Sequence, residues 1–147
     1  MNFQEIISNL PFTEPFLFVD EIESVSDTEI WGNYTFPKNS FFYAGHFKNN
    51  PVTPGTILSE CMAQIGLVSF GIHLLRDEFK TTENFQPKIA LTSTEIEFYL
   101  PVYPNEKVRV FSKKVYFRFN KLKCAIKMYN QKGNLVSKGE ISGMMKL

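Results

Sequence analysis

Cysteine, histidine and tryptophan are scarce in this chain of 147 residues, which contains two cysteines, two histidines and one tryptophan. Cys61 and Cys124 lie far apart and show neither the spacing of a metal site nor a disulfide pattern. We interpret them as reduced core residues of a cytoplasmic protein. The sequence also lacks a metal-ligand cluster and a glycine-rich phosphate loop, so no metal and no cofactor are expected.

Long uninterrupted hydrophobic runs are also missing. The most apolar stretch contains Glu60, Gln64 and Arg76, so no membrane-spanning segment is predicted. The N-terminus lacks the basic start and apolar run of a signal peptide, which again favours the cytoplasm. The length suits a single domain over residues 1–147, and 15 phenylalanines with 44% hydrophobic residues indicate a globular chain.

Net charge is only +1, but the charges are unevenly distributed along the chain. Residues 1–104 carry five basic and thirteen acidic side chains, whereas residues 105–147 carry eleven basic and two acidic ones. A candidate basic cluster consists of Lys113, Lys114, Arg118, Lys121 and Lys123. These side chains form either the solvated faces of strands or a docking site for an acidic partner. Nucleic-acid binding is not expected, because the aromatic residues needed for base stacking are assigned to the core.

One long helix is predicted in the middle of the chain, after a short helix over Phe3–Leu10. It is expected to run from Pro54 to about Arg76 with Thr53 as its N-cap, and a polar stretch, residues 77–86, follows it. Apolar residues cover every face of this helix, which predicts burial on all sides. Its glycines, Gly66 and Gly71, are expected where another element approaches closely.

Two strand-like segments precede this helix in the sequence and four follow it. They are Phe16–Val25, Glu29–Phe36, Lys88–Leu100, Lys107–Phe119, Lys121–Tyr129 and Leu135–Leu147. In the fifth segment apolar residues alternate with lysines, which predicts one packed and one solvated face. The alternation slips around Ser112–Lys114, which predicts a bulge. Short turns between the last strands require antiparallel neighbours. The expected architecture is an α+β hot-dog fold, a curved antiparallel sheet wrapped around one long buried central helix.

A histidine in a glycine-flanked loop and a carboxylate inside the apolar helix are the candidate reactive groups. His46 follows Gly45, and Glu60 lies on the second turn of the helix. An unpaired carboxylate in apolar surroundings costs several kcal/mol, so a site that needs one base and one acid would explain both residues. The structural alternatives are a loop histidine and a glutamate favoured by the helix dipole. His73 is interpreted as a packing residue at the helix end.

Seven short motifs resemble, in the same order, those of the 3-hydroxyacyl-acyl-carrier-protein dehydratases of fatty acid synthesis, in the type that carries Glu on the helix. The 14-residue step from His46 to Glu60 matches that family as well. The motifs are Leu10-Pro11, Pro15 to Asp20, Gly45-His46-Phe47, Pro51-Val52, Pro54-Gly55, Glu60 to Gln64, and Pro101 to Pro104.

The resemblance implies dehydration of 3-hydroxyacyl thioesters, carried on the pantetheine arm of an acyl carrier protein, to trans-2-enoyl thioesters. His46 would remove the proton beside the thioester carbonyl, and Glu60 of the other subunit would protonate the departing hydroxyl. The Val52 carbonyl would hold the second ring nitrogen of His46. The Gly55 N–H would face the thioester oxygen, and Gln64 would orient Glu60. A homodimer or a trimer of dimers is implied.

Three departures from the family pattern change these expectations. Lys48-Asn49 replaces the usual Pro-Gly after the histidine, and Phe12 stands where a histidine often follows the first Leu-Pro. Glu97, Tyr99 and Leu100 stand where basic residues are common before Pro101. Carrier docking is therefore expected on the basic cluster instead. The pathway is expected to be either fatty acid synthesis or a specialised one of a polyketide or aryl-polyene type, and these departures favour the specialised one. An acyl thioesterase and a non-catalytic acyl-binding subunit of a heterodimer are the alternatives, and both are disfavoured by the presence of His46 together with Glu60.

Overall fold

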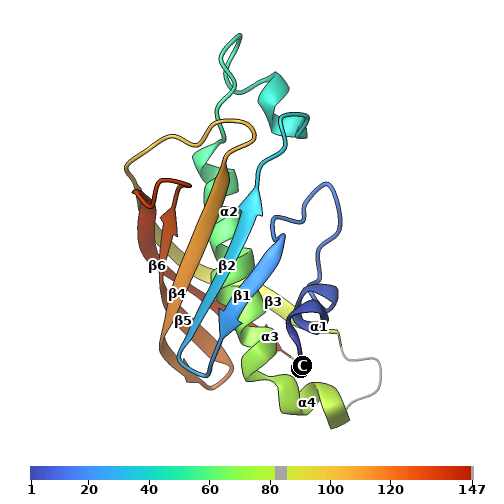
Figure 1. Cartoon of the computed structure of the whole chain (residues 1–147). Helices are drawn as coiled ribbons and strands as arrows, with labels where there is room; N and C mark the ends of the chain where they lie inside the picture. Colours follow the sequence, from blue (N-terminus) through green and yellow to red (C-terminus); the bar gives the residue numbers. More distant parts are fainter. Residues whose placement is uncertain (82–85, 147) are drawn as a thin grey trace.

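The structure, a computed structural model, describes residues 1–81 and 86–146. Its strands are β1 (Glu21–Val25), β2 (Glu29–Thr35), β3 (Lys88–Phe98), β4 (Lys107–Arg118), β5 (Lys121–Tyr129) and β6 (Leu135–Lys146). They form one antiparallel sheet with the order β1-β2-β4-β5-β6-β3 (Figure 1). Strands β1 and β3 are therefore the edges of the sheet, although β3 follows β2 in the sequence.

The helices are α1 (Phe3–Ser8), the 3-10 turn η1 (Phe41–Ala44), α2 (Gly55–Ala63), the π-helical segment η2 (Gln64–Ser69), α3 (Phe70–Leu74) and α4 (Arg76–Thr81). Segments α2, η2 and α3 follow each other directly and form one continuous helix. The wider turns of η2 place the Ser69 hydroxyl 2.7 Å from the Gln64 carbonyl, to which it donates. The predicted long helix is thus present. It ends at Leu74, and the separate short helix α4 begins at Arg76.

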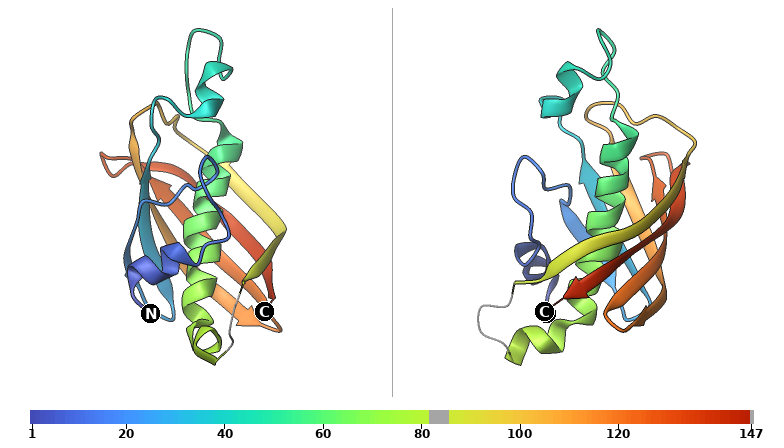
Figure 2. Two further views of the ribbon diagram at one scale, coloured as in Figure 1. Left: turned by 90° about the vertical axis from the view of Figure 1, so that its right-hand side faces the viewer. Right: turned by 180° about the vertical axis from the view of Figure 1, so that it is seen from behind.

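The sheet curves around the continuous helix, so that strands lie on opposite sides of it (Figure 2). All residues from Cys61 to Ile72 are buried. A Cβ on Gly66 would lie 2.7 Å from Ile126 Cδ1 on β5, so the expected close approach of helix and sheet is confirmed. By length and composition this helix could cross a membrane, but most of it is buried inside the protein, and it is the core helix of the fold.

The predicted strand patterns agree well with the structure. The alternate residues Leu122, Cys124, Ile126 and Met128 of β5 are buried, and the register between β4 and β5 shifts between Lys114 and Tyr116, which confirms the bulge. Both cysteines are free and buried, and burial raises the pKa of the Cys124 thiol to about 11. The prediction of an α+β sheet around a buried helix is confirmed.

Three predicted boundaries need correction. Strand β1 begins at Glu21 rather than Phe16, because the Phe18 N–H donates to the Gln64 side chain instead of a neighbouring strand. Thr53 is not the N-cap: the helix begins at Gly55 and Pro54 precedes it. The polar stretch after the long helix begins with α4, and its residues 82–85 lie outside the described part of the chain, as does Leu147.

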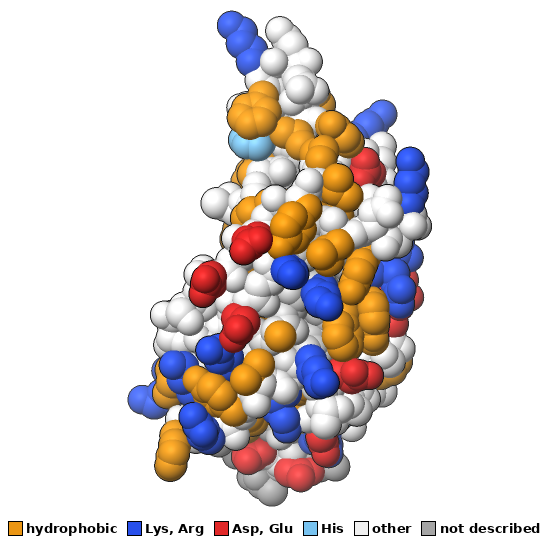
Figure 3. All heavy atoms as spheres, turned by 90° about the vertical axis from the view of Figure 1, so that its left-hand side faces the viewer, with side chains coloured by type: hydrophobic (Ala, Val, Ile, Leu, Met, Phe, Trp, Pro, Cys, Tyr) orange, Lys and Arg blue, Asp and Glu red, His pale blue; other side chains and the backbone are white. Residues whose placement is uncertain are grey.

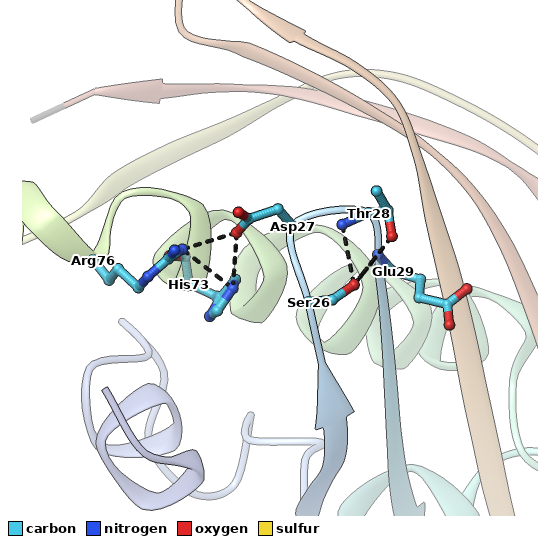
Figure 4. A network of polar contacts seen from close by, with 6 residues as sticks. All are labelled: Ser26, Asp27, Thr28, Glu29, His73 and Arg76. Atoms are coloured by element: carbon cyan, nitrogen blue, oxygen red, sulfur yellow. Dashed lines mark hydrogen bonds and ion pairs between the residues drawn. The ribbon is translucent and has the colours of Figure 1, made fainter.

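A polar network fastens the β1–β2 turn to the end of the long helix (Figure 4). The Asp27 carboxylate accepts a hydrogen bond from Arg76 at 3.0 Å, and His73 Nε2 lies 3.2 Å from the same oxygen. Burial lowers the pKa of His73, and the positive charge of Arg76 lowers it further. The side chain of His73 is only 12% exposed, so this histidine ties the helix end to the hairpin, in line with the structural interpretation from the sequence.

Candidate active site

A loop between η1 and α2, residues 44–52, carries His46. The Val52 N–H donates to the His46 carbonyl at 2.9 Å, and His46 Nδ1 lies 2.8 Å from the Val52 carbonyl oxygen. A carbonyl oxygen only accepts hydrogen bonds, so Nδ1 has to carry the ring proton. The neutral imidazole then presents the lone pair of Nε2, which is the nitrogen that can accept a proton from a bound molecule.

His46 lines a pocket of about 340 Å³ whose walls are mainly apolar. The pocket is lined by Phe47, Val52, Thr53, Gly55, Leu58, Phe98, Tyr99, Leu100 and Pro101 in addition to His46. Figure 3 shows a histidine at the surface beside hydrophobic side chains at this end of the molecule. Gly55 is the first residue of α2, and N–H groups in a first helical turn have no intrahelical acceptor. The pocket therefore combines an imidazole base with the positive end of a helix.

Glu60 is positioned on another face of the helix. Leu58, which lines the pocket, and Glu60 are two residues apart and so about 200° apart around α2. The Glu60 carboxylate accepts a hydrogen bond from Gln64 Nε2 at 3.1 Å. Gln64 is fully buried, donates also to the Phe16 carbonyl at 3.1 Å, and accepts from the Phe18 N–H at 2.8 Å. These three bonds hold the amide in one orientation beside the carboxylate.

The structure thus separates the predicted site residues into two groups within one chain. His46, Val52 and Gly55 surround the pocket, whereas Glu60 and Gln64 form a second group next to the segment Phe16–Phe18. The imidazole and the carboxylate therefore have different neighbours within one chain.

Three members of the basic cluster, Arg118, Lys121 and Lys123, lie toward the other end of the sheet from the His46 loop. Thr35 pairs with Lys107 at the end where the chain enters that loop, while Arg118 pairs with Lys121 at the opposite end of β4. Lys113 and Lys114 lie between these ends on β4, and Lys123 forms an ion pair with Glu140 at 3.1 Å. On the lower part of the face drawn in Figure 3, basic side chains lie with hydrophobic side chains between them.

The aromatic wall of the pocket was not predicted from the sequence. Phe98 and Tyr99 are 47% and 45% exposed, and the Phe98 ring lies 3.5 Å from where a Cβ on Gly55 would be. The Tyr99 hydroxyl donates to Glu97 at 2.8 Å. Phe98 lies inside the predicted strand Lys88–Leu100, and in the structure it ends β3 with its ring close to Gly55 at the start of α2.

A family model described as a FabA-like domain matches residues 10–143. The chain belongs to the FabA-like dehydratase family. A 3-hydroxyacyl-[acyl-carrier-protein] dehydratase FabZ from Ehrlichia canis (strain Jake) is 30% identical over 99% of this chain and 95% of the relative. The FabZ of Clostridium perfringens (strain SM101 / Type A) is 32% identical over 75% of this chain and 74% of the relative. The family predicted from the motifs is confirmed.

Solved structures share the fold of this FabA-like chain at low sequence identity. The dehydratase heterocomplex ApeI:P from Xenorhabdus doucetiae superposes with a TM-score of 0.79 at 11% identity, covering 97% of this chain and 91% of that one. A hypothetical thioesterase with coenzyme A from Streptococcus pneumoniae TIGR4 gives a TM-score of 0.60 at 16% identity, covering 86% and 84%. The predicted hot-dog fold is confirmed.

Proposed function

We propose that this chain removes water from 3-hydroxyacyl thioesters held by an acyl carrier protein and produces trans-2-enoyl thioesters. The observation that carries the proposal is the contact between the His46 ring and the Val52 carbonyl. His46 Nδ1 is held 2.8 Å from the Val52 carbonyl, which leaves Nε2 as a base in the wall of an apolar pocket. Membership in the family supports the same reaction, for which the FabZ relatives are named.

The proposed reaction is a proton abstraction followed by loss of water. His46 Nε2 takes a proton from the carbon beside the thioester carbonyl, and negative charge develops on the carbonyl oxygen. The Gly55 N–H and the positive end of α2 stabilise this charge. Glu60, in its acid form, gives its proton to the 3-hydroxyl as the C–O bond breaks. Water leaves, and the electron pair of the broken C–H bond forms the new double bond.

A dimer is proposed because His46 and Glu60 face different sides within one chain. Strand β3 is an edge strand of 11 residues with exposed apolar side chains such as Leu91 and Phe98. Such an edge favours pairing with a second chain. Pairing of two β3 edges would produce a homodimer, alone or in a trimer of dimers, in which Glu60 of one subunit serves His46 of the other.

Antiparallel pairing through β3 also suggests how a carrier protein would dock. Lys88 begins β3 at the end that carries the basic cluster, and Phe98 ends it beside the pocket. Two antiparallel copies would therefore bring the basic end of one subunit to the side where the partner has its His46 loop. We propose that Lys113, Lys114, Arg118, Lys121 and Lys123 attract the acidic carrier for the neighbouring subunit's pocket.

The aromatic wall of the pocket supports a specialised pathway, and we propose that the protein works in the cytoplasm. Tyr99 and Leu100 line the pocket where basic residues are usual in the family. An aromatic and apolar wall favours a flat or conjugated acyl chain. The proposed substrates are therefore intermediates of a polyketide-like or aryl-polyene type rather than those of general fatty acid synthesis.

The deciding experiment is incubation with a panel of 3-hydroxyacyl carrier-protein thioesters, alkyl and aryl, followed by mass spectrometry. Loss of one water from the thioester, fastest with aryl chains, is expected. Release of free acid would indicate a thioesterase instead. Tight binding without any change of mass would indicate a non-catalytic acyl-binding subunit. Fastest loss of water from unbranched alkyl chains would contradict the specialised pathway alone.

A further inference from the structure

A hydrogen bond between two buried side chains closes the base of the loop that carries His46. Tyr43 is the third residue of η1 and directly precedes residues 44–52, and Thr53 follows them. The Tyr43 hydroxyl and the Thr53 hydroxyl are 2.6 Å apart, and the two residues are only 6% and 4% exposed. The loop of residues 44–52 is thus held at both of its ends by one contact, away from solvent.

Thr53 is in turn attached to the body of the protein and to the histidine. Its N–H donates to the Val102 carbonyl at 2.8 Å, and Val102 is fully buried. Val52, the residue before Thr53, holds His46 twice, through the backbone at 2.9 Å and through the imidazole at 2.8 Å. A displacement of Thr53 would therefore move both atoms of Val52 that orient His46.

We propose that Tyr43 and Thr53 are positioning residues, which fix the His46 imidazole by clamping the two ends of its loop. The proposal rests on the role of His46 as the base under Proposed function. Neither side chain is required to touch the reacting atoms. Their effect passes from the Tyr43 hydroxyl to Thr53, then through Val52 to the ring.

Inside the loop, the His46 ring also stacks on the neighbouring Phe47 ring, with the centroids 3.9 Å apart. Most residues of the loop are exposed, and a pair of backbone hydrogen bonds joins Phe47 with Asn50, both inside the loop. These contacts shape the tip of the loop but do not attach it to the sheet or to α2. The Tyr43–Thr53 contact joins the N-terminal end of the loop to its C-terminal end. Val102 holds the C-terminal end through the Thr53 N–H, so the two contacts together orient the loop relative to the pocket.

The test compares Tyr43→Phe, Thr53→Val and the double variant with the unmodified protein in the dehydration assay. Each single variant is expected to lower kcat about tenfold with little change of KM, since a misplaced base reacts slowly with a substrate that still binds. Thr53→Ser keeps the hydroxyl and should retain most of the activity. The matched control is Tyr34→Phe, another buried tyrosine, located on β2 outside the loop, which should leave kcat unchanged.

Two readouts separate positioning from a purely structural role. The Nδ1 proton of His46, observed by NMR, should exchange faster with water in the single variants because its bond to Val52 is loosened. The double variant removes both polar groups together, so its melting temperature should recover toward that of the unmodified protein while kcat stays low. Recovery of kcat together with stability, or an unchanged Nδ1 exchange rate, would overturn the proposal.

Failure of the proposal is distinguishable from failure of the proposed function. If His46→Ala retains full dehydration, the role of His46 as the base is wrong. If His46→Ala is inactive while Tyr43→Phe and Thr53→Val behave like Tyr34→Phe, only the positioning role is wrong.

Discussion

At the scale of single residues, the two candidate reactive groups depend on different neighbours for their orientation. A backbone carbonyl, that of Val52, fixes the proton of His46, and an amide side chain, Gln64, fixes the Glu60 carboxylate. The position of Val52 depends in turn on the Tyr43–Thr53 contact, whereas the Gln64 amide depends on its own bonds to Phe16 and Phe18.

Replacement of either reactive group should abolish most of the turnover. His46→Ala and Glu60→Gln are each expected to lower kcat at least about a hundredfold, the usual scale for the loss of a positioned base or acid. Steady-state rates of water loss would be measured beside circular dichroism of the same samples. Glu21→Gln, exposed on β1, is the control expected to keep full activity. Near-normal turnover of either variant would refute its assigned role.

His73 should make the free energy of unfolding depend on pH. Burial lowers its pKa in the folded protein below the unfolded value of about 6.5. The unfolded chain then binds more protons, so stability falls as the pH drops through and below that value. Urea titrations between pH 7.5 and about pH 5 should show this decrease, and His73→Gln should flatten it. An equal pH dependence of the free energy of unfolding in the unmodified protein and in His73→Gln would show that His73 does not cause it.

At the scale of elements, strand β6 has to pair with a neighbouring strand along both of its edges. Its residues pair with β5 on one side and with β3 on the other, so it connects the core of the sheet to the edge that borders the pocket. Gly139 lies in this strand, where a Cβ would overlap the Glu95 carbonyl oxygen and come within 2.7 Å of Ile96 Cα. The spacing between β3 and β6 therefore depends on the missing side chain at this position.

Gly139→Ala should destabilise the protein by about 3 kcal/mol, since the backbone of β3 has to move to admit a methyl group. Chemical denaturation would measure the loss. Glu140→Ala, the neighbouring exposed position, removes only a surface ion pair with Lys123 and should cost less than about 1 kcal/mol. Equal stability of Gly139→Ala and the unmodified chain would show that β3 is not held as described.

Regular patterns made most elements predictable from the sequence. The alternation in β5 fixed its buried face, and the slip near Lys114 located the bulge. Contacts between distant residues were harder to predict: Phe18 bonds to Gln64 and so leaves the strand pattern, and Thr53 bonds to Tyr43 instead of capping the helix. In both cases a side chain from another element replaces the local partner, and no spacing rule identifies that partner.

The same limit applies to the candidate site. Its candidate reactive residues stand out because a histidine next to Gly45 in a loop and a glutamate in an apolar helix break the local pattern. The pocket wall formed by Phe98 and Tyr99 follows the pattern of a strand end, so nothing in the sequence separated it from the core. Its role became visible only through the position of β3 at the sheet edge beside β6.

At the scale of the whole molecule, activity should depend on two chains. Mixing His46→Ala with Glu60→Gln should restore part of the activity, because half of the sites in a mixed dimer would combine an intact His46 with an intact Glu60. Subunit exchange would be followed by native mass spectrometry and turnover measured on the same mixture. Complete exchange without any recovery would show that each site is built within one chain.

The basic cluster should act on the encounter with the carrier protein. Charge reversal of Arg118 and Lys121 is expected to raise KM for the carrier-bound substrate about tenfold at low salt and to leave a short pantetheine thioester unaffected. The difference should disappear near 1 M salt, where screening is nearly complete. Reversal of Lys127 and Lys132, toward the other end of β5, is the matched control. Equal losses on both substrates would indicate damage to the fold instead.

The order of elements along the chain has a consequence for synthesis on the ribosome. The apolar helix Gly55–Leu74 emerges before β3, β4, β5 and β6, the strands that cover much of it. Translation at about 5–20 residues per second leaves this membrane-like segment uncovered for several seconds. During that interval it resembles the substrates of chaperones and of the targeting machinery for membrane proteins. Codons that slow translation between Leu74 and Lys88 would lengthen the exposure and lower the yield of folded protein.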